Sequence, residues 1–138
     1  MRFMLIVKAS EASEAGELPP KEAFDAMGRY NEELVKAGVL LAADGLQPSS
    51  MGARIDFTNP GKPAIIDGPF TETKELIAGY WLIQVASRDE ALAWAVRAPF
   101  GGGVLELRQV HEVSDFPPDA MSPEAAERDR RLREQLSS

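Results

Sequence analysis

Two segments of this chain are apolar on both of their alternating faces, and this pattern restricts the possible folds more than any other feature. Residues 2–8 read Arg-Phe-Met-Leu-Ile-Val-Lys, and residues 80–85 read Tyr-Trp-Leu-Ile-Gln-Val. Because consecutive side chains of a β-strand point to opposite faces, a strand of this kind has to be covered on both sides. We therefore expect both segments to be strands inside a sheet.

One helix is predicted between these two strands and another after them. The first spans about residues 20–37: Pro19-Pro20 suits a first turn, and Gly38 stands where a glycine commonly ends a helix. The second begins after Ser87, which forms a capping box with Glu90. Apolar residues at helical spacing mark the expected buried faces: Phe24, Met27, Tyr30, Leu34 and Val35 in the first helix, and Ala91, Leu92, Ala95 and Val96 in the second.

Shorter strands complete the pattern. Alternation and turn residues predict strands at 39–43 and 104–110 and a β-hairpin made of 53–57 and 63–67, whereas residues 9–18 are expected to form a loop. The order βαββαβ, with the hairpin inserted in the middle, predicts an α+β, ferredoxin-like sandwich. In that topology the two doubly apolar strands lie at the centre of the sheet, in agreement with their sequence.

The composition changes near the C-terminus, and we divide the chain into a domain at residues 1–116 and a tail at residues 117–138. Pro117-Pro118 ends the domain, and Ser122 followed by a proline is typical of a helix start. The tail helix, to about residue 136, has only a thin apolar seam. We expect it to be solvated or loosely docked rather than a specific partner-binding helix.

One face of the predicted sheet lacks a cover. The two helices pack on one face, and the thin tail helix is a poor cover for the other, so a large apolar face would meet water. A second copy of the chain, packed sheet to sheet with twofold symmetry, removes this exposure. We therefore predict a homodimer through the sheet face; the alternative is that the tail helix folds over it.

Composition narrows the classes of partner. The formal net charge of −7 provides no basic field for phosphates and argues against nucleic-acid binding. No apolar run approaches the roughly 20 residues of a membrane span, and the apolar run after Arg2 is too short for a signal peptide. The absence of cysteine excludes disulfides, thiolate metal sites and a cysteine nucleophile, and it fits a cytoplasmic location.

The segment from Asp67 to Glu75, Asp-Gly-Pro-Phe-Thr-Glu-Thr-Lys-Glu, resembles the signature of the DGPF-domain branch of the YCII-related proteins. Gly79-Tyr80 and the segments 44–48 and 103–108 are similar to further parts of that family's pattern. The resemblance spans roughly residues 1–116. It implies a dimeric α+β barrel built from ferredoxin-like units, with a cleft lined by polar residues.

The resemblance leaves the activity open. Most members have no assigned function, some relatives act in the breakdown of chlorinated aromatics, and some genes of this type neighbour, or are fused to, extracytoplasmic-function sigma factors. YCII proteins in the narrower sense have a histidine–aspartate pair proposed as a catalytic site. Residues 27–30 of this chain read Met-Gly-Arg-Tyr where that histidine would stand. The histidine-dependent mechanism is therefore not carried over.

The candidates for lining a cleft are seven polar residues: Asp44, Asp67, Thr71, Lys74, Glu75, Glu106 and Arg108. Gly68 permits an unusual backbone angle, Pro69 stiffens the turn, and Phe70 is expected to plug the core. Lys74 suits an anionic substrate, and Asp67 or Glu75 suits the role of proton acceptor if burial raises its pKa. The structural alternative is a turn with helix caps and a lysine–carboxylate pair.

The last strand places Glu106 and Arg108 on one face, because residues two apart in a strand point the same way. They either form an ion pair at the dimer interface or reach a carboxylate-bearing ligand. Arginine suits such a ligand because its planar guanidinium can donate two parallel hydrogen bonds to a carboxylate. Asp44 either caps a turn or points into the cleft. His111 is the only histidine and no carboxylate cluster at ligand spacing accompanies it, so we expect no metal site. No cofactor is expected either.

Two functions remain open from the residues alone. The first is a dimer whose polar cleft binds, and in an enzyme would transform, a small polar or anionic metabolite without metal or cofactor. The second is a non-catalytic accessory or regulatory module that acts through protein contacts, with a link to an extracytoplasmic-function sigma factor suggested by the resemblance. The choice between an enzyme and a binding module stays open.

Overall fold

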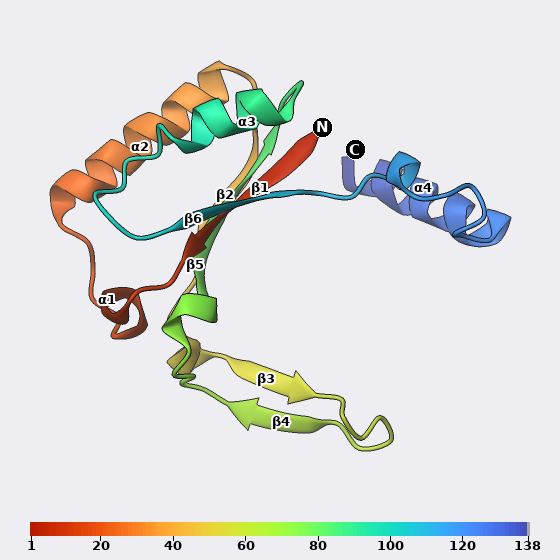
Figure 1. Cartoon of the computed structure of the whole chain (residues 1–138), viewed down its shortest axis with the longest axis horizontal. Helices are drawn as coiled ribbons and strands as arrows, with labels where there is room; N and C mark the ends of the chain where they lie inside the picture. The colour runs from red at the N-terminus through yellow and green to blue at the C-terminus, as the bar shows by residue number, and fades with distance from the viewer. Residues whose placement is uncertain (138) are drawn as a thin grey trace.

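The computed structural model describes residues 1–137 and contains a four-stranded antiparallel sheet with two long helices, residues 21–36 and 88–95, on one side (Figure 1). The strands lie in the order β2-β5-β1-β6, so the two doubly apolar strands are central. This arrangement confirms the α+β, ferredoxin-like fold expected from the sequence. The elements that form the sheet and the helical layer packed on it are β1 (Arg2–Lys8), α2 (Lys21–Lys36), β2 (Leu40–Gly45), β5 (Ile77–Gln84), α3 (Arg88–Ala95) and β6 (Leu105–Gln109).

The core lies between the sheet and helices α2 and α3. The register between β1 and β5 places Phe3 opposite Ile83 and Leu5 opposite Trp81. These four side chains are buried under the helices, where burial of each apolar side chain contributes about 1.5–3 kcal/mol. The other buried members of the core are Tyr30, Leu34, Val39, Val85 and Ala91.

Tyr30 connects the two helices with the sheet. Its ring meets the ring of Trp81 edge-on, with centroids 5.4 Å apart, and its hydroxyl donates to the carbonyl of Trp94 at 2.7 Å. Trp81 donates its indole N–H to the side-chain oxygen of Asn31 at 2.7 Å. The polar ends of both buried rings therefore have partners, as burial requires.

The buried faces of the helices are narrower than the apolar spacing predicted. Phe24 and Val35 of α2 and Val96 at the end of α3 are exposed, so their expected burial was wrong. An α-helix turns about 100° per residue, which puts Phe24 and Val35 roughly a quarter turn from the buried Leu34. The sheet therefore covers the row through Tyr30 and Leu34 and leaves Phe24 and Val35 in solvent.

Residues 9–18 are not a loop throughout, which corrects the expectation for this segment. Helix α1 (Glu11–Glu14) forms there with Ser10 as its N-cap. Ser10 and Ser13 form a capping box, since the side chain of each accepts the backbone N–H of the other. The two serines three residues apart were the signal for this short helix, which lacks the apolar face that longer helices show.

The start of α3 agrees with the sequence in one contact and differs in another. The Ser87 hydroxyl accepts the N–H of Glu90 at 3.1 Å, as the capping box predicted. The Glu90 carboxylate accepts the N–H of Ala86 at 2.9 Å rather than that of Ser87. The carboxylate therefore satisfies a donor one residue before the cap.

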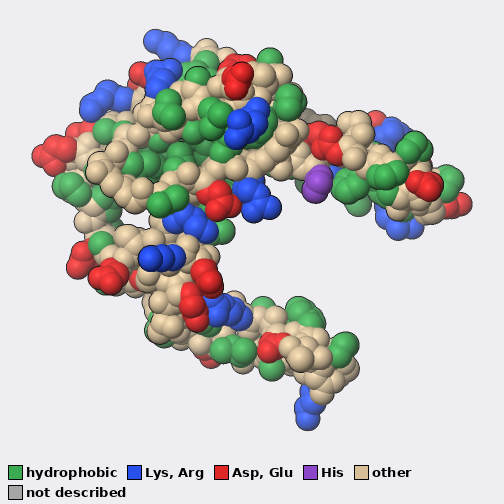
Figure 2. Space-filling view, viewed as in Figure 1, with side chains coloured by type: hydrophobic (Ala, Val, Ile, Leu, Met, Phe, Trp, Pro, Cys, Tyr) green, Lys and Arg blue, Asp and Glu red, His purple; other side chains and the backbone are tan. Residues whose placement is uncertain are grey.

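Two arms extend from the sheet on the side away from α2 and α3, and Figure 2 shows the hollow between them. The first arm is the predicted hairpin, made of β3 (Ala53–Asp56) and β4 (Ala64–Asp67). The second follows β6 and contains α4 (Pro123–Ser137), which Ser122 caps as expected. The single-turn helices η1 (Ser49–Met51), η2 (Thr73–Glu75) and η3 (Val113–Asp115) lie at the bases of these arms.

Candidate functional site on the open sheet face

The face of the sheet that points away from the helices has an apolar centre. The strand registers place Leu82 of β5 opposite Met4 of β1 and Tyr80 opposite Ile6. These side chains alternate with the buried core residues and are only half-buried. Three of the polar candidates, Asp44, Glu106 and Arg108, lie at the two edges of this face, on β2 and on β6.

Lys8, Glu106 and Arg108 form the charged cluster at the β6 edge. The Glu106 carboxylate lies 3.9 Å from Nζ of Lys8 and 3.4 Å from Nη1 of Arg108. The Arg108 side chain is 71% exposed, so most of its donors face solvent. Glu106 and Arg108 thus pair as the strand spacing suggested. Lys8 was missed, although it continues the alternation of Met4 and Ile6 on the same face.

Asp44 lies in β2 at the opposite edge of the face. The hydroxyl of Tyr80 donates to its carboxylate at 3.4 Å. Asp44, Tyr80, Ile6 and Glu106 form one row across four strands, with neighbouring strands about 4.8 Å apart. Asp44 and Glu106 are therefore separated by roughly 14 Å. A single chain does not bring Asp44 to the cluster of Glu106 and Arg108.

Gly68 lies at the base of the hairpin arm, directly after Asp67, which ends β4. Its φ is not positive, so the expected reason for a glycine at this position was wrong. A Cβ on Gly68 would lie 1.8 Å from the carbonyl oxygen of Ser49. Glycine is required here because two backbone segments approach each other closely, as they also do in the hydrogen bond from the Gly68 N–H to the Gly52 carbonyl.

Phe70 does not enter the core, which corrects a second expectation for this segment. Its ring lies under the guanidinium of Arg54, with Cζ 3.9 Å from the ring centroid. Its backbone N–H donates to the hydroxyl of Ser49 at 3.0 Å. Ser49 in turn donates its own N–H and hydroxyl to the Glu14 carboxylate. Phe70 therefore stabilises the attachment of the hairpin and not the sheet.

The remaining candidates lie at this hairpin base and in the turn η2. Asp67, Thr71, Lys74 and Glu75 are exposed, and within residues 1–137 none of their side chains forms a hydrogen bond or an ion pair. The lysine–carboxylate pair of the structural alternative is thus absent from the described residues. The turn η2 adjoins the end of β1, so Lys74 and Glu75 lie near the Lys8 end of that strand.

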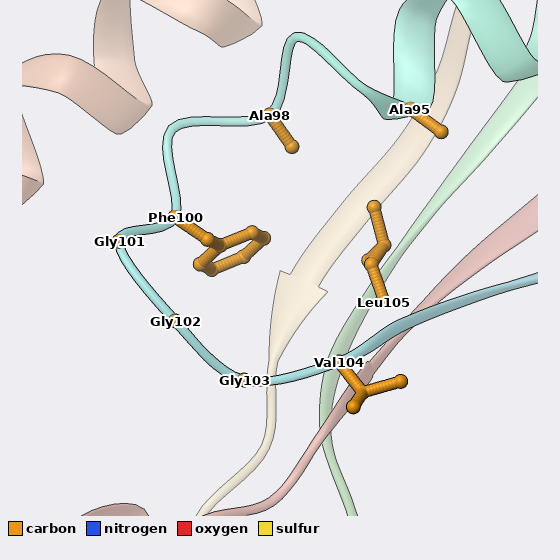
Figure 3. A pocket seen from close by; sticks show the side chains of 8 residues that line it. All are labelled: Ala95, Ala98, Phe100, Gly101, Gly102, Gly103, Val104 and Leu105. Carbon is orange, nitrogen blue, oxygen red and sulfur yellow. The ribbon is translucent and has the colours of Figure 1, made fainter.

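Two pockets lie away from the seven candidates. One, of about 280 Å³, lies between the end of α3 and the glycine loop before β6 (Figure 3). Its walls are the backbone of Gly101–Gly103 and small or apolar side chains such as Ala98, Phe100 and Leu105, so it offers no acid or base. The other, of about 680 Å³, lies between η3 and α4.

Metal ligands are not clustered in the part of the chain that the structure describes. It contains no group of three or more His, Cys, Asp or Glu side chains placed to hold a metal ion. His111 is exposed and packs against the ring of Phe116, with centroids 5.0 Å apart. None of the helices within residues 1–137 is long and apolar enough to cross a membrane.

Comparison with known proteins identifies the family. A model of the YCII-related domain matches residues 1–114. An uncharacterized protein of Rhizobium meliloti (strain 1021) is 43% identical over 69 residues, which are 50% of this chain and 55% of that protein, so the match spans about half of that relative. The solved structure of 5-chloro-2-hydroxyhydroquinone dehydrochlorinase from Burkholderia phenoliruptrix AC1100, in complex with 2,5-dihydroxybenzoquinone, is similar with a TM-score of 0.45 and 15% identity over 85% of this chain and 100% of that one. Because the family model covers far more than half of its residues, the chain belongs to the family of YCII-related domains.

Proposed function

We propose that the protein is a homodimer that packs through its open sheet face and binds a small polar or anionic metabolite there. The observation that carries this proposal is the face itself, an apolar centre bordered by an exposed arginine in a chain of net charge −7. Within the YCII-related family we assign the protein to the DGPF-domain branch, because its residues Asp67–Glu75 resemble the signature of that branch. We also propose that the two copies together form an α+β barrel. Neither a metal nor an organic cofactor is part of the proposal.

Arg108 is the residue best suited to hold an anion. It makes one 3.4 Å contact with Glu106, and the rest of its guanidinium is free to donate to a ligand. A guanidinium presents five donors in a planar fork that matches a carboxylate or a phosphate. Lys8 lies on the other side of Glu106 and adds a second positive charge. The cluster of three residues therefore has a net charge of +1 in an acidic chain.

The apolar centre supports the dimer. Met4, Ile6 and Leu82 lie side by side on β1 and β5, and the helices cover only the opposite face. A contiguous apolar patch on a sheet is unusual on a monomer and is commonly an interface. A second copy of the chain carries the same patch, so twofold packing covers both patches at once.

The chemistry available to a bound ligand is proton transfer. Tyr80 and Asp44 form a hydroxyl–carboxylate pair at 3.4 Å on the same face as Arg108. Such a pair can give and accept a proton if a ligand lies within hydrogen-bond reach. Lys74 and Glu75 border the same face from η2 and complete the proposed site together with Asp67 and Thr71.

The binding proposal is tested with a panel of small carboxylates and phosphates, screened by thermal shift and measured by calorimetry. We expect Arg108→Ala to weaken the strongest hit about tenfold or more, because a hydrogen bond to a charged group contributes about 1.5–3 kcal/mol. The matched control is Arg88→Ala, an exposed arginine at the start of α3. Equal affinity of the Arg108 and Arg88 variants would show that the anion does not bind at this face.

The dimer is tested separately by light scattering. At micromolar concentration we expect twice the chain mass of 15.0 kDa. Met4→Asp puts a charge in the middle of the apolar patch and should shift the protein to the single-chain mass, while Asp25→Ala on α2 should leave the dimer intact. A wild-type mass of one chain contradicts the proposal.

A further inference from the structure

We infer that the hairpin arm of each copy docks in the groove between η3 and α4 of the other copy. The inference rests on the proposed homodimer and adds the surfaces by which the two copies hold each other. Three observations support it. The hairpin arm exposes apolar side chains, the groove between η3 and α4 is open, and the arm and the groove lie at opposite ends of the same sheet.

The hairpin arm exposes three large apolar side chains close together. The cross-strand pair Ile55 and Ile65 lies on one face of the hairpin, and these side chains are 51% and 74% exposed. Phe57, two residues after Ile55, is 65% exposed. A two-stranded hairpin is at best marginally stable alone in water, so this arm requires a surface to pack on.

The base of the arm holds it away from its own sheet. Ser49 receives the N–H of Phe70 and donates to Glu14, and the Gly68 N–H donates to the Gly52 carbonyl at 3.0 Å. Arg54 at the root of the hairpin lies over the ring of Phe70. These contacts fix the direction of the arm, so folding back over its own open face would require breaking several of them.

The groove of about 680 Å³ between η3 and α4 is lined by both apolar and charged side chains. Val113, Pro123 and Ala126 are its apolar members, and Arg130 and Arg133 are among its charged ones. Arg130 and Arg133 are paired with carboxylates of the same helix, so they need no further charge from a ligand. An apolar segment with few charges therefore fits this groove, and the Ile55–Ile65 face of the hairpin is one.

The η3 side of the groove is fixed to the sheet. Arg2 in β1 makes two hydrogen bonds to the Glu112 carboxylate, at 2.8 and 3.2 Å, just before η3. The Glu112 N–H donates to Asp115 within the capping box of η3. The second arm is thus attached to the sheet at the beginning of β1.

The topology places the two arms so that twofold symmetry can exchange them. The hairpin follows the end of β2, whereas the second arm follows the end of β6, and β2 and β6 run in opposite directions in this sheet. The arms therefore leave from opposite ends of the strands, on the same side of the sheet (Figure 1). A twofold axis that lies across the strands exchanges these ends and brings each hairpin to the other copy's groove. Such an isologous contact forms twice and closes the assembly, which favours a second copy over an unrelated partner.

The inference is tested by cross-linking, which is clean because the chain has no cysteine. Ile65→Cys labels the hairpin, Ala126→Cys labels the groove, and Asp25→Cys on the outer side of α2 is the control. Pairs of single-cysteine chains, one of them enlarged by a tag, are co-expressed and treated with a short bismaleimide. We expect the mixed product of Ile65→Cys with Ala126→Cys to exceed either self-product at least fivefold, and Asp25→Cys to give only background.

Each other result overturns the inference. Self-linking of Ile65→Cys as strong as the mixed product would show that the two hairpins meet each other. Absence of the mixed product in a protein with the mass of two chains would show that the dimer exists without this exchange, so the inference fails while the proposed dimer stands. A mass of 15.0 kDa would remove both.

Discussion

The hydroxyl of Ser49 lies 2.5 Å from a carboxylate oxygen of Glu14, and this contact joins helix α1 to the base of the hairpin arm. The same hydroxyl accepts the N–H of Phe70 at 3.0 Å. One side chain therefore connects three segments that are far apart in the sequence. The direction of the hairpin arm depends on this connection.

Replacing Ser49 by alanine removes both of these hydrogen bonds and leaves the Phe70 N–H without its partner. We expect Ser49→Ala to lower the free energy of unfolding by about 1–3 kcal/mol, the usual result of leaving a half-buried donor unsatisfied. Urea unfolding measures the change. Ser50→Ala, at an exposed neighbouring position, should stay within about 0.5 kcal/mol of the wild type, and similar losses in both variants would contradict the role given to Ser49.

A methyl group at Gly68 would meet the Ser49 carbonyl oxygen at 1.8 Å, so the backbone has to move to accept it. We expect Gly68→Ala to destabilise the protein by about 2 kcal/mol or more, with faster amide hydrogen exchange at the hairpin base. Gly61→Ala is the matched control, because a Cβ on Gly61 has no atom within 4 Å. If both variants unfold at the same urea concentration, the close approach at Gly68 is not a constraint.

The pKa of Tyr30 gives a prediction at high pH. Burial raises this pKa to about 12, Arg97 acts in the opposite direction and Glu33 adds to the increase. Folding favours the neutral hydroxyl of Tyr30 over its ionised form. This preference stabilises the folded protein below the unfolded pKa of about 10, and the stabilisation is lost as the pH rises from 10 towards 12. The free energy of unfolding should therefore fall by roughly 1–3 kcal/mol over this window.

The measurement is urea unfolding between pH 9 and pH 12, compared with Tyr30→Phe. The phenylalanine variant lacks the hydroxyl and should lose less stability over the same window, although it starts lower because the bond to the Trp94 carbonyl is gone. Ultraviolet titration provides an independent check, since the hydroxyl of Tyr30 should ionise only near pH 12. If the free energy of unfolding falls equally with pH in the wild type and in Tyr30→Phe, the loss of stability does not come from Tyr30.

Glu112 gives a prediction at low pH. The hydrogen bonds from Arg2 hold the pKa of this carboxyl below its usual value of 4.5, against a smaller opposing effect of burial and with added attraction from Arg2, Arg133 and the N-terminus. A lowered pKa stabilises the fold above the unfolded value, and that contribution disappears as the pH falls through the folded value. Because both side chains are partly exposed, we expect a loss of under about 1 kcal/mol.

Glu112→Gln should reduce the dependence of stability on pH below 4.5, whereas Glu124→Gln on α4 should leave it unchanged. The free energies of unfolding of both variants, measured with urea at several values between pH 2.5 and pH 6, test this difference. A Glu112 variant as sensitive to acid as the wild type would show that the Arg2 contact does not depend on the charge of Glu112.

The local elements were predictable because their signals lie within single segments. The double apolarity of β1 and β5 indicated two central strands, and Pro20 and Gly38 bounded α2 closely. Helix α1 was missed because it lacks an apolar face, and other failures concern which side chains are covered. Phe24 and Val35 fitted the helical spacing but lie outside the strip that the sheet contacts. Phe70 fitted a core position but packs on the hairpin base instead.

The candidate site shows the same division. Spacing within one strand predicted that Glu106 and Arg108 share a face, and the structure places them together. Lys8 joins them only because β1 pairs with β6, and Asp44 remains about 14 Å from Glu106 because β1 and β5 lie between their strands. Neither relationship follows from spacing along the chain.

The sequence by itself determined the strands, the long helices, their order and the face on which each strand residue lies, because these follow from periodicity over a few residues. Only the tertiary structure decided which edge residues meet across the sheet and how Ser49 connects Glu14 with Phe70. It also decided that the two arms leave from opposite ends of the open face. These relationships depend on strand register and on close backbone approaches between distant segments, which no local pattern encodes.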